Sequence, residues 1–145
     1  MKFTIGKEAL LEGLNQVQHV VSTRATLPIL SNVLIEAADG KLKLTTTDLD
    51  VGVSGSVEAN INKEGSTTLP VKRLVSIIRE LPASEVEISV DSKNHASIKS
   101  GPSFFKIIGL GEDEFPPLPK FEDATEFKIS QGVLHDAIKK TSYAI

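Results

Sequence analysis

A short alternating segment near the start of the chain is followed by apolar residues that recur every three or four positions. Residues 2–5 alternate polar and apolar side chains, as a half-buried strand does. Five apolar residues carry the helical spacing: Leu10, Leu11, Leu14, Val17 and Val21. Pro28 ends any helix before the next segment, because its ring is incompatible with a helix interior. The pattern predicts a strand and then an amphipathic helix.

The same arrangement returns 64 residues later, from Thr4 to Thr68, and again near Phe127. The second copy places apolar residues at the equivalent helical positions: Leu74, Val75, Ile78 and Leu81. The third copy does so at Leu134 and Ile138. A strand followed by an amphipathic helix is a common pattern, so coincidence is the alternative. Three aligned copies favour a true internal repeat.

Strand-like runs follow each of the first two predicted helices. They cover residues 33–37, 41–46, 51–57, 86–90, 96–99 and 104–108. The pair Asp39-Gly40 is typical of a hairpin turn between the first two runs. Each half is therefore strand, helix and three strands. We predict an α+β domain over residues 1–111, built of two β-α-β-β-β halves with two helices packed on antiparallel sheets.

Residues 112–126 have the composition of an acidic, proline-rich linker. Six acidic residues and one lysine give the segment a net charge of -5, and three prolines favour an extended chain. Residues 127–145 then supply a strand and a helix but no further strands. Such a unit cannot bury its apolar face alone. We therefore expect residues 127–145 to be the truncated start of a second domain, and the natural chain to continue beyond Ile145.

Composition narrows the class of protein. The net charge is -3, so the chain outside the acidic linker carries +2, and the acid does not exclude a nucleic-acid partner. No apolar run approaches the roughly 18 residues that span a bilayer, and residues 1–5 do not resemble a signal peptide. The absence of cysteine excludes disulfides and fits a cytoplasmic protein.

Few residues indicate an enzyme. His19, His95 and His135 lie on different predicted elements without metal-ligand spacing. Asp48 and Asp50 could bind magnesium, as a metal-dependent hydrolase would require, but the end of a strand is the simpler explanation. We expect no catalytic residues, no metal and no cofactor.

The second predicted helix carries the most informative polar face. Its polar residues are Lys72, Arg73, Ser76, Arg79 and Glu80. Lys72, Ser76 and Arg79 are spaced i, i+4, i+7 and form one line along the helix, the cationic stripe. The stripe is either an ordinary solvated face or a surface for phosphates, which are bound by Lys and Arg without reading of bases.

Six short segments together resemble one known family. They are MKFTI at 1–5, RATLPIL at 24–30, LTTTDL at 44–49, TLPV at 68–71, LP at 81–82 and FPPL at 115–118. In order and spacing they resemble the first domain of the bacterial sliding clamp, the DNA polymerase III beta subunit. The resemblance implies a DNA-clamp fold and a processivity factor for DNA replication. In that family two chains of three similar domains form a homodimeric ring around double-stranded DNA, tether the replicative polymerase and are loaded by an ATP-driven clamp loader.

The resemblance also implies DNA contacts. Arg24 matches an arginine that contacts DNA in the family, and Lys72 matches a contact that is usually arginine. Lysine keeps the charge but loses the bidentate geometry of a guanidinium. Arg73 and Arg79 are further candidates, and Lys99 ranks last because it lies on a predicted strand.

The predicted strand at 104–108 matches the family's dimer interface, where it meets the third domain of the other chain. The contacts carried over are Arg73, Phe105 and Ile107, although an ordinary core strand would have the same composition. Better-known members carry basic residues where this chain has Pro102 and Phe104, so ion pairs are not expected there. The family's pocket for partner peptides lies in later domains. The alternative function is a repeat-built protein-interaction module without a DNA role.

Overall fold

The computed structural model describes residues 1–22, 26–82, 84–120 and 125–145. The helices are α1 (Lys7–Val17), α2 (Val71–Glu80) and α3 (Gln131–Thr141), with short 3-10 turns η1 (Gln18–Val20), η2 (Pro28–Ser31), η3 (Glu112–Glu114) and η4 (Ser142–Ala144). The strands are β1 (Lys2–Gly6), β2 (Asn32–Ala38), β3 (Lys41–Thr47), β4 (Gly52–Glu58), β5 (Asn60–Lys63), β6 (Gly65–Pro70), β7 (Glu85–Val90), β8 (His95–Ser100) and β9 (Ser103–Ile108). The predicted α+β class and the strand runs are confirmed.

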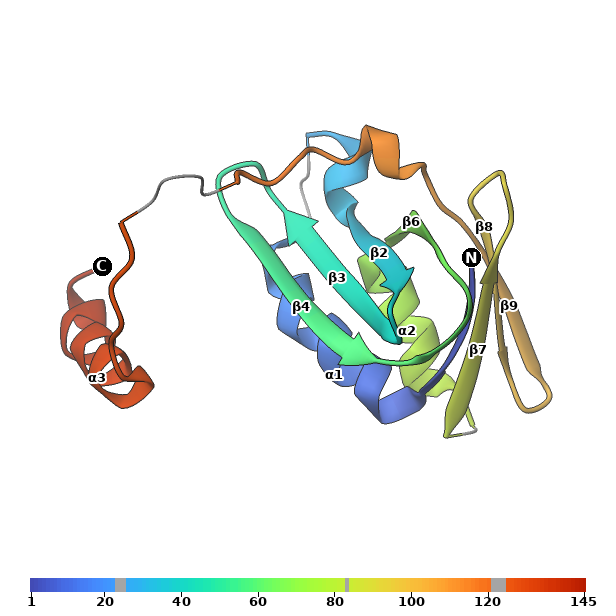
Figure 1. Ribbon diagram of the computed structural model, residues 1–145, viewed down its shortest axis with the longest axis horizontal. Helices are drawn as coiled ribbons and strands as arrows, with labels where there is room; N and C mark the ends of the chain where they lie inside the picture. Colours follow the sequence, from blue (N-terminus) through green and yellow to red (C-terminus); the bar gives the residue numbers. More distant parts are fainter. Residues whose placement is uncertain (23–25, 83, 121–124) are drawn as a thin grey trace.

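Two antiparallel sheets share the strands of the two halves. One sheet has the order β5-β1-β7-β8-β9 and the other has the order β4-β3-β2-β6. The first strand of each half therefore joins the sheet of the other half: β1 pairs with β7, and β6 pairs with β2. The exchange ties the halves into one domain and supports the repeat, because β1 and β6 occupy equivalent places (Figure 1).

The two helices cover the sheets from one side and meet each other (Figure 1). Leu10 and Leu14 of α1 and Leu74 and Ile78 of α2 have no exposed surface. These are the residues that the repeat aligns. Burial of such side chains stabilises a fold by roughly 1.5–3 kcal/mol each, so the repeated positions supply much of the common core.

The structure differs from the sequence predictions at three places. Strand β5 was not predicted, because its sequence NINK carries only one apolar residue, Ile61, and pairs with β1 at a sheet edge. Residues 125–130 form no strand, because a strand needs a partner and none lies beside them in the described chain. The segment after residue 111 is not extended throughout, since Glu112–Glu114 forms a 3-10 turn and Phe115 is only 8% exposed.

Helix α3 is present as predicted but covers no core. Ser130 caps its first turn by accepting a hydrogen bond from the Val133 amide. Its apolar residues Val133, Leu134 and Ile138 are all exposed. Within the described residues, no helix combines the length and the apolar character that crossing a membrane requires.

Candidate nucleic-acid interface

Helix α2 separates its apolar and charged residues cleanly. Val71, Leu74, Val75 and Ile78 are buried against the sheets, which leaves the opposite side to the cationic stripe. Lys72, Ser76 and Arg79 are all exposed. The stripe predicted from helical spacing therefore lies on the open surface of the helical layer.

The charges of the stripe are available to a ligand. Within the described chain, neither Lys72 nor Arg79 forms an ion pair through its side chain. Ser76 instead donates a hydrogen bond of 2.9 Å to the Lys72 carbonyl and so turns back onto its own helix. The stripe thus presents two free cations separated by a satisfied hydroxyl group.

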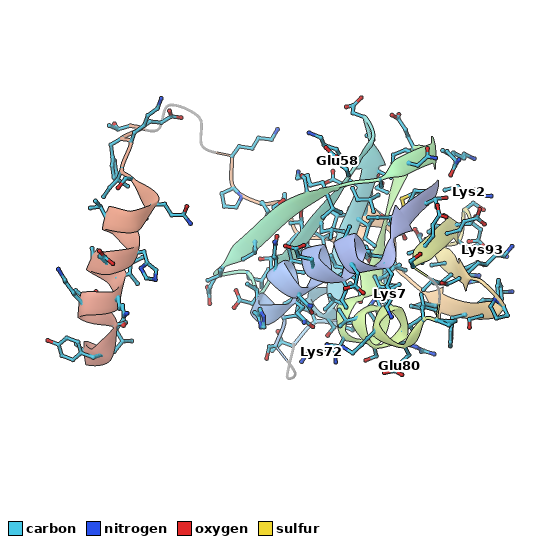
Figure 2. All side chains as sticks on the ribbon, turned by 90° about the horizontal axis from the view of Figure 1, so that it is seen from below. Lys2, Lys7, Glu58, Lys72, Glu80 and Lys93 are labelled. Atoms are coloured by element: carbon cyan, nitrogen blue, oxygen red, sulfur yellow. The ribbon has the colours of Figure 1, made fainter. Side chains whose placement is uncertain are left out.

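Lys7 joins the two helices and was missed by the sequence reasoning. Its ammonium nitrogen Nζ donates to the Arg79 carbonyl at 2.9 Å and to the Leu81 carbonyl at 2.8 Å. These carbonyls lie at the C-terminal end of α2, where a cation is favourable. Figure 2 shows Lys7 beside the end of α2, with Lys72 and Glu80 on the same helical layer. Lys7 lies in the first turn of α1, where the helix dipole disfavours a cation. That unfavourable position was the sequence signal that Lys7 has a partner elsewhere.

The predicted DNA contacts are only partly placed. Lys72 and Arg79 share one helix face, whereas Arg24 lies outside the described residues. Lys99 lies on β8, and its ammonium group is 5.9 Å from the centre of the Phe104 ring. Lys99 is thus part of the sheet surface and not of the cationic stripe.

Strand β9 is an edge strand, as the sequence suggested. It pairs with β8 on one side and ends the five-stranded sheet. Phe104, Phe105 and Ile108 are 50%, 39% and 71% exposed. Ile107 is 1% exposed, so its side chain belongs to the core and only its main chain is open to a partner. Phe104 and Ile108 belong to the strand that was assigned to the interface but were not named as contacts, although the alternation of β9 places them together on one face.

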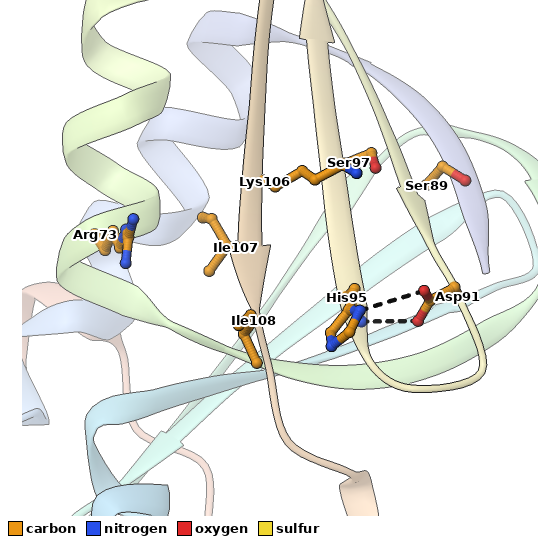
Figure 3. A pocket seen from close by; sticks show the side chains of 8 residues that line it. All are labelled: Arg73, Ser89, Asp91, His95, Ser97, Lys106, Ile107 and Ile108. Atoms are coloured by element: carbon orange, nitrogen blue, oxygen red, sulfur yellow. Dashed lines mark hydrogen bonds and ion pairs between the residues drawn. The ribbon is translucent and has the colours of Figure 1, made fainter.

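Arg73 lies at this edge and not within the stripe. It lines a cavity of about 450 Å³ together with Lys106, Ile107 and Ile108 of β9. In the view of Figure 3, Arg73 faces Ile107 and Ile108 from the helix side. Of its two predicted roles, DNA contact and interface contact, the position beside β9 favours the second.

The cavity contains an acidic residue, Asp91, whose carboxylate is hydrogen-bonded to the backbone of its own turn. Its carboxylate accepts hydrogen bonds from the backbone amides of Lys93 at 2.8 Å and His95 at 3.0 Å. It also lies 3.5 Å from His95 Nδ1, and Figure 3 shows both contacts with His95. The His95 amide is the main cause that lowers the pKa of Asp91. The carboxylate closes the β7–β8 hairpin and stays charged.

Asp48 serves a turn in the same way. Its Oδ1 atom accepts hydrogen bonds from the backbone amides of Asp50 at 3.0 Å and Val51 at 2.7 Å. Among the described residues, no group of three or more potential metal ligands comes together. The explanation of Asp48 as the end of a strand agrees with this geometry.

Comparison with known proteins gives consistent matches. Residues 1–119 match the family model of the DNA polymerase III beta subunit, N-terminal domain. The whole chain is 36% identical to the beta sliding clamp of Chlamydia muridarum and 33% identical to that of Bacillus subtilis, and it covers 40% of each relative. The solved sliding clamp of Bacillus subtilis matches with a TM-score of 0.92 and 32% identity over 99% of this chain and 40% of that one. The beta subunit of Caulobacter crescentus matches with a TM-score of 0.91 and 34% identity over 99% of this chain and 39% of that one. The chain thus spans about 40% of the length of these relatives.

Proposed function

Because the chain belongs to the family of DNA polymerase III beta subunits, we propose that it forms one unit of a sliding clamp that encircles duplex DNA. The clamp would act as a processivity factor in DNA replication and would tether the replicative polymerase. The observation that carries the proposal is the cationic stripe, in which Lys72 and Arg79 are exposed on the outer side of α2 and form no ion pair with any described residue.

The stripe suits a contact that must slide. Lysine and arginine attract phosphates without reading bases, so the same attraction is available at every step along a duplex. Two cations give weak binding, which a ring tolerates because topology keeps it on DNA. A larger cluster would hold the ring in place. Arg24 is a further proposed contact on the strength of the family resemblance alone.

The β9 edge is the proposed contact with a second chain. Its main chain is open on one side, and Arg73 and Phe105 are accessible beside it. Ile107 would contribute through its main chain, because its side chain is buried. We further propose a homodimer, an ATP-driven clamp loader as a partner, a cytoplasmic location and no catalytic role. These proposals rest on family membership.

Titration with duplex DNA distinguishes a sliding clamp from a protein-interaction module without a DNA role. In a titration of the ¹⁵N-labelled chain at low salt, we expect amide shifts centred on Lys72, Ser76 and Arg79. Binding should be weak, on the order of 10⁻⁴ M at low salt, and should weaken by only about tenfold between about 50 and 200 mM salt, because two phosphate contacts give a salt slope of about -1.8.

Two outcomes of this titration would count against the proposal. An interaction module without a DNA role would show no shifts at the stripe at low salt. A nanomolar complex that survives 200 mM salt would indicate a dedicated, sequence-reading site and not a sliding surface. Titration with a polyacidic peptide of equal charge is the control for nonspecific attraction.

A further inference from the structure

The segment that leaves β9 is held against the domain at separate points. Residues 110–118, here called the strap, begin at Leu110, whose amide and carbonyl both pair with Thr68 at 3.0 Å. The Thr68 hydroxyl also donates to the Leu110 carbonyl. Further along, Phe115 packs with Ile29 and Leu30 in a small second core. Figure 1 shows the strap, in orange, crossing from the end of β9 toward the turn between β3 and β4.

From Phe115 onward a cavity lies between the chain and the sheet. It has a volume of about 470 Å³ and separates this part of the chain from β2, β3 and β4. The cavity is lined on the sheet side by Leu34, Glu36, Lys43, Thr45 and Ser54. Prolines 116, 117 and 119 cannot donate main-chain hydrogen bonds, so the sheet cannot hold this part by a ladder. The position of the strap after Phe115 therefore depends on side-chain packing.

Leu118 supplies this packing, because its side chain lies against Gly52, the first residue of β4. A Cβ atom added at Gly52 would lie 2.6 Å from Leu118 Cδ2 and within 3.6 Å of two further Leu118 atoms. Such an approach is far inside van der Waals contact, so the Leu118 side chain would have to shift to admit any side chain at position 52. Because Gly52 has no Cβ, the Leu118 side chain can pack directly against its backbone.

We propose that the contact between Leu118 and Gly52 is a latch that fixes the point at which the chain leaves the domain. It thereby restricts the orientations available to α3 and to whatever follows it. Leu118 is the last residue of the strap and stands two positions before Lys120. The proposal rests on this packing alone and is tested without DNA, so it stands or falls apart from the clamp function.

Trypsin cleavage after Lys120 measures the latch directly, because a protease needs several residues on each side in an extended, undocked form. We expect Gly52→Ala and Leu118→Ala each to raise the cleavage rate at Lys120 several-fold. The matched control is Gly55→Ala on the same strand, where the new Cβ would meet Gln16 Oε1 at an ordinary 3.5 Å. Its cleavage rate should equal that of the unaltered chain.

The double variant Gly52→Ala/Leu118→Ala distinguishes a latch from general destabilisation. If the two residues act through one contact, the double variant is cleaved no faster than Leu118→Ala. A second readout uses the absence of native cysteine: dyes at Ser56→Cys and Lys140→Cys report the spread of distances between β4 and α3. We expect Gly52→Ala to broaden this spread while the thermal midpoint of the domain stays unchanged. An unchanged cleavage rate and an unchanged distance spread in Gly52→Ala would overturn the proposal, as would additive effects in the double variant.

Discussion

The double charge reversal Lys72→Glu/Arg79→Glu is expected to reduce the affinity of the chain for duplex DNA by about 100-fold at 50 mM salt. Each lost phosphate contact lowers the slope of log affinity against log salt by about 0.9, so two contacts lower it by nearly 2. The new carboxylates add repulsion from the phosphates. Fluorescence anisotropy with a labelled duplex, repeated across a salt series, gives the affinity and the salt slope of the unaltered chain, and the loss of binding by the double variant gives a lower limit for the reduction.

A second double reversal controls for net charge. Lys63→Glu/Lys93→Glu changes the formal charge by the same amount but lies on β5 and on the β7–β8 turn, away from the cationic stripe. This variant should lose several-fold less affinity and keep its salt slope. Equal losses in the two double variants would mean that overall charge, and not the stripe, attracts DNA.

Replacing Gly109 with alanine is expected to destabilise the domain by about 2–3 kcal/mol, because the new methyl group has no room. Its Cβ would overlap the Thr68 carbonyl oxygen and would lie 3.0 Å from the carbonyl oxygen of Asn94. Both carbonyls belong to backbone that is already fixed: Asn94 accepts from the Gly109 amide at 2.8 Å, and Thr68 accepts from Leu110 at 3.0 Å. Neither can move without breaking the junction between β9 and the strap.

Urea unfolding followed by circular dichroism measures this effect. Gly55→Ala is again the comparison, since its Cβ makes only ordinary contacts, and it should shift the free energy of unfolding by less than about 0.5 kcal/mol. A similarly small shift for Gly109→Ala would show that the junction relaxes easily. In that event the β9 edge would not be rigidly placed relative to the strap.

Local pattern predicted most of the elements but not their pairing. The alternation at 33–37 and the helical spacing from Leu74 to Leu81 report on burial of one face, which neighbouring residues largely determine. The exchange of β1 and β6 between the sheets depends on distant pairs, such as Lys2 with Ser89 and Asn32 with Pro70, and nothing in either strand encodes its partner. Strand β5 was missed for a related reason, since its pairing with β1 and not its own composition makes it a strand.

In the candidate site, too, local features were predicted and long-range contacts were not. The cationic stripe follows from spacing on one helix, so Lys72 and Arg79 were placed together correctly. The hydrogen bonds from Lys7 to the Arg79 and Leu81 carbonyls join residues more than 70 positions apart and could not be predicted from either segment. The seat of Leu118 on Gly52 is likewise a long-range fit, and a glycine in a strand indicates close approach without naming the neighbour.

Retention on circular and linear DNA tests the central claim most directly. The proposed ring-forming protein that contains this chain would be loaded onto a nicked circular plasmid by its clamp loader and separated from free protein by gel filtration. The plasmid would then be cut once by a restriction enzyme. We expect the protein to elute with the circle and to be lost after cutting, because an encircling ring slides off a free end. Equal retention on the circular and the linear DNA would contradict the account.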